Sequence, residues 1–178
     1  VTKWVQVDLG QAQAIEQITV IAASDNFNNI GNGFGFPVRY KIEASSDTTF
    51  ETGVTVVTDK TKADEPNPGI APQHFKPDNL EARYIRVTAT KLAKRSGDYI
   101  FALAELRLLD ANGDNLAKGK TITALDSIEA PVRWRKSNLV DALYPGKAND
   151  PAIAKELQVL VSVRDKLLQP ILSGEIAA

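Results

Sequence analysis

The sequence contains no cysteine and no methionine, and it has a single histidine among its 178 residues. The absence of cysteine excludes disulfides, thiolate metal sites and cysteine nucleophiles. With His74 alone, a multi-histidine metal site is excluded, and a Ser/His/Asp mechanism would have one possible base. Because methionine is missing even at position 1, we interpret the chain as a mature, excised or recombinant piece of a longer protein.

A large net charge is also missing. The chain has 21 Lys and Arg against 22 Asp and Glu, which gives a formal net charge of −1. It therefore has no overall attraction to nucleic acid or to an anionic membrane. No run of about 18 apolar residues is present, which is what a membrane-spanning helix requires. We predict neither a nucleic-acid partner nor membrane insertion.

Alternating apolar and polar residues dominate the first 125 residues. Such alternation is typical of strands with one buried face, while more continuous β-branched runs are typical of central strands. Seven strands are expected at residues 4–9, 18–23, 38–45, 53–58, 83–90, 102–109 and 119–124. Roughly eight strands without helices between them predict an all-β fold, an antiparallel jelly-roll β-sandwich.

The pattern changes near residue 149. Asp150 can cap a helix and Pro151 suits its first turn, and apolar residues then recur at three- and four-residue spacing up to Leu172. This spacing predicts a C-terminal amphipathic helix. The helix either packs against the sandwich or belongs to a helical region of the parent protein, and we favour the second interpretation.

Four sequence motifs occur in order between residues 4 and 109: "WVQVDLGQAQAIEQITV", "GFPVRYKIEASSD", "ARYIRVTATK" and "ALAELRLL". Together they resemble the discoidin family, also called the coagulation factor five/eight type C domain. This family includes many bacterial galactose-binding-like carbohydrate-binding modules. The resemblance implies an eight-stranded jelly roll, no catalytic activity, and ligand binding by the loops at one end.

Two further segments resemble the start of the family's domain, yet they follow the closing strand. They are "NLAKGKTITALDS" at residues 115–127 and "KSNLVDALYPG" at residues 136–146. They either begin a second tandem module or supply the displaced first strand of a circularly permuted one. Asn112-Gly113 is a strong hairpin signal, which suggests that residues 102–109 and 116–124 are adjacent antiparallel strands.

We favour permutation, because residues 1–109 alone lack an edge strand and would leave the flank of the closing strand open. The predicted domain is a discoidin-like sandwich over residues 1–146, in which residues 115–146 supply the displaced N-terminal strand and loop. Residues 147–178 form a helical extension or a linker to the parent. In this arrangement Glu105 and Asp141 are near neighbours.

The resemblance also implies a structural calcium ion. Its matching positions are the side chains of Glu105 and Asp141 and the backbone carbonyls around Ser137 and Asn138. Calcium binds six to eight oxygen ligands. Ala142 stands where the family has a turn glycine, and the second acidic residue of the family's motif is missing. The alternative is that Asp141 caps a turn and that Glu105 pairs with an arginine or with backbone amides.

Exposed aromatic residues on loops are candidates for sugar binding, because a ring can stack on the apolar face of a sugar. The loop at residues 24–37 and the segment before the closing strand supply the predicted carbohydrate-binding residues, which are Phe27, Phe34, Arg95 and Tyr99. Phe36 is expected in the core, and Trp134 either binds ligand or plugs the end of the barrel.

From these observations we predict a non-catalytic carbohydrate-binding module. It would target a larger secreted or cell-surface bacterial protein to a glycan, so the expected localisation is extracytoplasmic. Its partners would be the glycan and other domains of the parent protein. The alternative is a structural or interaction domain that docks on neighbouring domains of the parent and binds no sugar.

Overall fold

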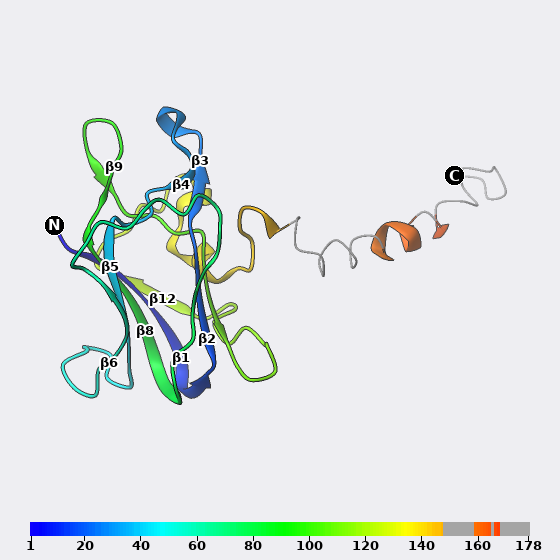
Figure 1. The fold of residues 1–178 in the computed structure, drawn as a ribbon. Coiled ribbons are helices and arrows are strands. Elements are labelled where there is room, and N and C mark those ends of the chain that lie inside the picture. Colours follow the sequence, from blue (N-terminus) through cyan, green and yellow to red (C-terminus); the bar gives the residue numbers. More distant parts are fainter. Residues whose placement is uncertain (148–158, 165, 168–178) are drawn as a thin grey trace. The chain divides into compact units, whose positions relative to one another are not determined.

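The computed structural model describes residues 1–147, 159–164 and 166–167. Its largest element is a five-stranded antiparallel sheet with the strand order β12–β1–β8–β5–β6 (Figure 1). In that order the strands are Thr121–Ala124, Lys3–Ile15, Leu80–Lys91, Arg39–Ser45 and Thr55–Lys60. A register shift between Asp8 and Gln13 interrupts the pairing of β1 with β8.

A second antiparallel sheet of three strands has the order β11–β2–β7, with the bounds Glu105–Leu109, Gln17–Ile21 and Gln73–Phe75. Two short hairpins complete the strands: β3 (Ala23–Asp25) with β4 (Gly31–Phe34), and β9 (Ala93–Lys94) with β10 (Tyr99–Ile100). Three 3-10 turns, η1 (Phe27–Asn29), η2 (Val132–Trp134) and η3 (Lys136–Val140), lie in connecting segments. The predicted antiparallel β-sandwich is therefore confirmed.

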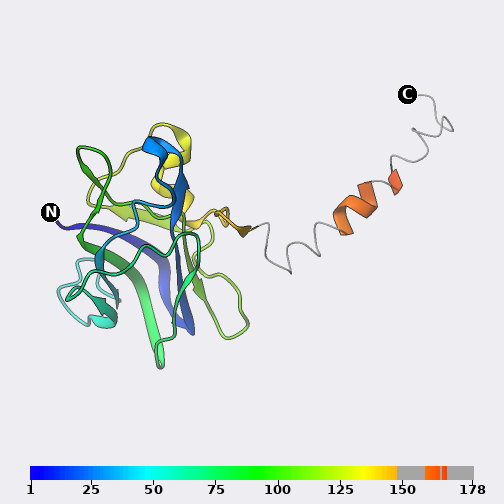
Figure 2. The ribbon, with the colours of Figure 1, turned by 45° about the horizontal axis from the view of Figure 1, so that its top comes forward.

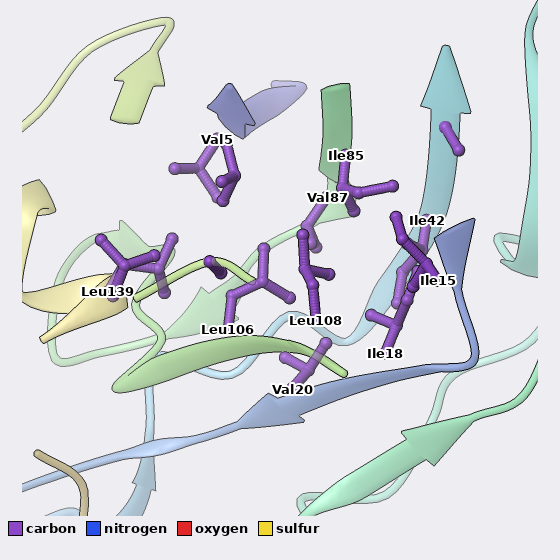
Figure 3. Packing of buried hydrophobic residues seen from close by; sticks show 14 of the residues in the cluster. Val5, Ile15, Ile18, Val20, Ile42, Ile85, Val87, Leu106, Leu108 and Leu139 are labelled. Carbon is purple, nitrogen blue, oxygen red and sulfur yellow. The ribbon is translucent and has the colours of Figure 1, made fainter. Parts of the chain in front are cut away.

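The core lies between the two sheets, and the alternating pattern of the sequence places its residues there. Figure 3 shows apolar side chains from both sheets meeting in the interior; they include Val5, Ile42, Ile85 and Val87 from the large sheet and Ile18, Val20, Leu106 and Leu108 from the small one. Each of these residues is buried. Alternate residues of a strand point to opposite faces of its sheet, so each strand contributes its apolar face.

The strand of residues 121–124 lies elsewhere than the hairpin signal predicts. β12 pairs antiparallel with β1, with Val5 opposite Ala124 and Asp8 opposite Thr121. The segment before β12 contacts the closing strand: Asn115 forms a bridge with Leu109, Leu116 N–H donates to Leu108 O at 2.8 Å, and Leu108 N–H donates to Asn115 Oδ1 at 3.1 Å. The Asn-Gly turn therefore crosses from one sheet to the other. The expected ladder between residues 102–109 and 116–124 is wrong.

Residues 1–145 form one compact unit, and residues 146–178 form another. In the second unit, residues 159–164 and 166–167 are helical, which agrees with part of the predicted amphipathic helix. The remainder of that prediction, including Asp150 and Pro151, lies outside the described residues. No helix in the described ranges is long and apolar enough to cross a membrane.

Two leucines test whether residues 115–145 are an integral part of the sandwich. Leu139 is 5% exposed and belongs to the core, whereas Leu143 is 68% exposed. We expect Leu139→Ala to lower the free energy of unfolding by about 2–4 kcal/mol, since a buried leucine loses its contacts and leaves a cavity. Leu143→Ala should change it by less than about 0.5 kcal/mol. Urea denaturation measures both; equal effects would contradict the packing.

Candidate functional site

A cleft of about 760 Å³ lies in the compact unit of residues 1–145, between segments that are far apart in the sequence. Its lining comes from the start of β1, from β3 and β4, from the β10 region, and from residues 124–145. Figure 1 places β3, β4 and β9 at the same end of the sandwich, and Figure 2 shows the segment in yellow beside η1. Because β12 pairs with β1, residues 124–145 begin at this end of the sandwich.

Asp25 connects the two sides of the cleft. Its Oδ2 accepts hydrogen bonds from the indole Nε1 of Trp134 at 2.8 Å and from Nε of Arg133 at 3.0 Å. Its Oδ1 accepts a hydrogen bond from the backbone N–H of Phe27 at 2.9 Å. The hydrogen bond from Trp134, together with those from Phe27 and Arg133, holds the pKa of Asp25 below its usual range. The carboxylate therefore stays charged at neutral pH.

An aromatic cluster surrounds Trp134. The ring of Phe34 stacks on it with 6.5 Å between centroids and 22° between planes, and the ring of Phe27 meets it edge-on at 6.2 Å. The guanidinium of Arg133 lies 5.0 Å from the Trp134 centroid, and that of Arg95 lies 5.0 Å from the Phe27 centroid. Stacked rings and cation–π contacts stabilise a rigid wall.

Of the four residues predicted to bind carbohydrate, Phe27, Phe34 and Arg95 belong to this wall and Tyr99 does not, while only Phe34 and Tyr99 line the cleft. Phe34 lines the cleft but is only 2% exposed, so its ring supports Trp134. Phe27 is partly exposed beside Trp134, while Arg95 covers Phe27 and pairs with Asp98. Tyr99 lines the cleft and is 66% exposed. Tyr99 is therefore the most accessible of the three predicted aromatic rings.

Sequence reasoning missed Asp25 and left the role of Trp134 open. These two residues are 109 positions apart, so no local pattern connects them. The one local feature of the sequence is that aspartate favours turns, in which its side chain accepts a hydrogen bond from the backbone N–H two residues later. Asp25 accepts such a bond from Phe27. Phe36, expected in the core, is buried there against Tyr40.

The residues predicted to bind calcium lie beside the same cleft. Oε1 of Glu105, which is fully buried, accepts a hydrogen bond from the backbone N–H of Ala142 at 3.2 Å. Oδ1 of Asp141 accepts one from the N–H of Leu143 at 2.7 Å. Asn138 is at the η3 turn, and its carbonyl accepts a hydrogen bond from the N–H of Asp141 at 3.5 Å. Ser137 is exposed in that turn.

Ala142 has a positive φ of 64°, the conformation that favours glycine. This is the position at which the resemblance implies a turn glycine. Among the described residues, no group of three or more His, Cys, Asp or Glu side chains could hold a metal ion.

The comparison with protein families decides the classification. The family model of the F5/8 type C domain matches residues 1–106 of the 178-residue chain. The chain belongs to the F5/8 type C domain family. The match ends within β11, so residues 115–145 lie outside it although they belong to the same compact unit. A search of curated proteins found no match to this sequence.

Solved structures similar to this chain include several carbohydrate-binding modules. Chitosan-binding module 1 from a chitosanase/glucanase of Paenibacillus sp. IK-5 is 21% identical, with a TM-score of 0.46 over 62% of this chain and 70% of that one. The family 32 module of Clostridium perfringens NanJ, in complex with galactose, is 21% identical, with a TM-score of 0.42 over 61% and 66%.

A third similar structure is the C. perfringens module CpGH89CBM32-5 in complex with GalNAc-β-1,3-galactose. It is 17% identical to this chain, with a TM-score of 0.43 over 61% of this chain and 66% of that one.

The charge of Asp25 gives the first test of this site. Folding lowers the pKa of this carboxyl, so its charge stabilises the native state at any pH above the pKa that the group has in the unfolded chain. This stabilisation is lost as the pH falls through the lower pKa of the folded state. At pH 7, Asp25→Asn should therefore lower the free energy of unfolding by roughly 1–2 kcal/mol, because hydrogen bonds to a charged group are replaced by weaker ones.

The difference between the native chain and Asp25→Asn should narrow as the pH falls below about 4, the ordinary pKa of an aspartate in the unfolded chain, toward the lower pKa of Asp25 in the folded chain. Urea unfolding at pH 7, 5 and 3 measures it. A difference that is the same at pH 7 and pH 3 would show that the charge of Asp25 does not stabilise the cleft.

Proposed function

We propose that the cleft is a carbohydrate-binding site and that the chain is a non-catalytic module of a larger secreted or cell-surface bacterial protein. The observation that carries this proposal is the ring of Tyr99, which is 66% exposed at a cleft that also presents polar and charged side chains. An apolar surface with a few converging polar groups is what a sugar site requires. Membership of the F5/8 type C family supports the same function.

In the expected binding mode, two walls of the cleft make different contacts with the sugar. The Tyr99 ring would stack on the apolar face of a sugar ring, which is a contact that tolerates many sugars. Side chains of the opposite segment, such as Arg133 and Asn138, would receive the hydroxyl groups. Asp25 is occupied with Trp134 and Arg133, so its part is to position those residues.

Such a module would act by localisation. A weak site that holds the parent protein on a polymer raises the effective concentration of the attached domains at their substrate. This role needs no acid, base or nucleophile in the cleft. The proposed role implies that the module lies outside the cytoplasm, where polymeric glycans are found. It also implies that other domains of the parent protein are covalently attached to the module.

One observation favours the second candidate, a docking domain without sugar binding. Several apolar side chains near or in the cleft are exposed, namely Leu125, Ile128, Val132 and Leu143. Exposed apolar surface of this kind also marks interfaces with protein. A glycan array separates the candidates, since a docking domain that is correctly folded should give no signal with any glycan.

We also propose that the chain is a circularly permuted member of its family. In support, β12 completes the large sheet at β1, and Glu105 of the closing strand contacts Ala142 of the segment after it. A truncated second module would be expected to fold separately from the first and not to share its core. The comparison of Leu139→Ala with Leu143→Ala tests this proposal too, because a separate module would leave Leu139 outside the first core.

We further propose a structural calcium ion between Glu105 and the turn at Asp141. Both carboxylates lie at one turn, with the carbonyls around Ser137 and Asn138 as further oxygen donors. Bound calcium would fix that turn beside the cleft.

For calcium, the expected result is a rise in melting temperature when the ion is added to chelator-treated protein, because a ligand of the native state stabilises it. Glu105→Gln should remove the rise, whereas Glu129→Gln, which changes an exposed carboxylate paired with Lys136, should keep it. Identical melting curves with chelator and with millimolar calcium would refute the site.

For the sugar site, Tyr99→Ala should weaken binding of whichever array-positive glycan is titrated by about fivefold or more, since aromatic stacking contributes roughly 1 kcal/mol or more. Tyr99→Phe should keep most of the affinity because the ring remains. Calorimetry measures both. Because Tyr99 is exposed, both variants should keep the fold of the native chain, which thermal unfolding checks. Equal binding by Tyr99→Ala and the native chain would remove Tyr99 from the site.

A further inference from the structure

Arg133 and Arg135 both line the cleft, on either side of Trp134. Both residues are exposed, and the side chain of Arg133 is 61% exposed. The turn η2 ends at Trp134, and the backbone N–H groups of Trp134 and Arg135 donate to Pro131 O and Val132 O at 2.9 Å and 3.2 Å. The two arginines are therefore carried by a short, hydrogen-bonded turn.

Each guanidinium is held through its Nε atom. Nε of Arg133 donates to Asp25 at 3.0 Å, and Nε of Arg135 donates to the backbone carbonyl of Glu129 at 3.3 Å. The Arg133 group also lies over the Trp134 ring, 5.0 Å from its centroid. Within the part of the chain that the structure describes, these bonds involve no terminal nitrogen of either arginine. The forked ends are thus available to a ligand.

The nearby carboxylates have other partners, and Asp141, which also lines the cleft, accepts a hydrogen bond from the backbone N–H of Leu143 at 2.7 Å. Asp126 pairs with Lys3, and Glu129 pairs with Lys136 at 2.7 Å. Asp25 accepts from Arg133, Trp134 and the Phe27 N–H. Cations and carboxylates around the cleft are close to balance, so long-range attraction does not determine what binds here. What binds here is determined instead by the geometry of the free terminal N–H groups of Arg133 and Arg135.

We propose that this cleft selects an acidic glycan, in which a carboxylate or a sulfate ester on the sugar is bound by the terminal nitrogens of Arg133 and Arg135. A guanidinium presents its N–H donors in a planar fork that matches two oxygens of one oxyanion. Anchoring through Nε fixes the fork before the ligand arrives, which reduces the entropy lost on binding. Tyr99 would stack on the ring that carries the acidic group.

This inference rests on the proposed sugar site but can fail separately from it. The full chain is titrated by calorimetry, at constant ionic strength, with oligogalactosides, oligogalacturonates and sulfated oligogalactosides of equal length. At least one acidic series should bind about tenfold or more tightly than the neutral one, because charge-assisted hydrogen bonds contribute roughly 1.5–3 kcal/mol. The uronate and sulfate arms distinguish the two sources of the oxyanion.

The variant Arg133→Gln/Arg135→Gln should lose that preference, so that the acidic and neutral series bind to it with equal affinity. A matched control, Lys62→Gln/Lys118→Gln, removes the same charge from exposed positions outside the cleft and should keep the preference. Arg133→Lys/Arg135→Lys keeps the charge without the fork, so it should recover only a small part of the preference.

The possible outcomes separate the two hypotheses. Neutral and acidic series that bind equally well would overturn the acidic selectivity and leave the sugar site standing. An acidic preference that survives Arg133→Gln/Arg135→Gln, in protein shown to be folded by its unfolding curve, would overturn the role of the two arginines. No binding to any of the three series or to a glycan array would overturn both the inference and the proposed function.

Discussion

The pairing of β12 with β1 is the constraint on which the rest of this structure depends. It adds the fifth strand to the large sheet and covers the flank of β1, which would otherwise be an open edge. It also fixes the direction in which residues 125–145 leave the sheet. These residues then return across the end of the sandwich, where Leu139 and Val140 enter the core and Trp134 meets Asp25.

The wall of the cleft around Trp134 is held in place by several contacts that are individually weak. An exposed ion pair such as that of Arg133 with Asp25 contributes little by itself. Here the same carboxylate also accepts from an indole and a backbone amide, and the indole is stacked on a buried phenylalanine. The carboxylate is therefore held by several groups at once, and its orientation determines that of Arg133. Networks of this kind position side chains more accurately than a single surface pair does.

Such an arrangement suits a binding module. A rigid wall and an exposed ring on the opposite hairpin offer a preorganised surface, so little conformational entropy is lost when a ligand binds. Affinity from stacking is broad, while directional N–H donors discriminate among ligands. In the proposed site the two contributions would come from different parts of the chain, Tyr99 from the β9–β10 hairpin and the arginines from the segment after β12. Ligand choice could therefore change in one part without disturbing the other.

The sequence by itself determined the strands and their buried faces, because alternation at period two reports directly which side of a strand avoids water. Segments 38–45 and 83–90 match β5 and most of β8 for this reason, and the motif order indicated the family. Tyr99 could be identified from the sequence as an aromatic residue with an exposed side chain, and therefore as a candidate for ligand binding. Only the tertiary structure decided that β12 joins β1 and that Asp25 holds Trp134. Both depend on contacts between residues more than one hundred positions apart, which leave no periodic trace in either segment.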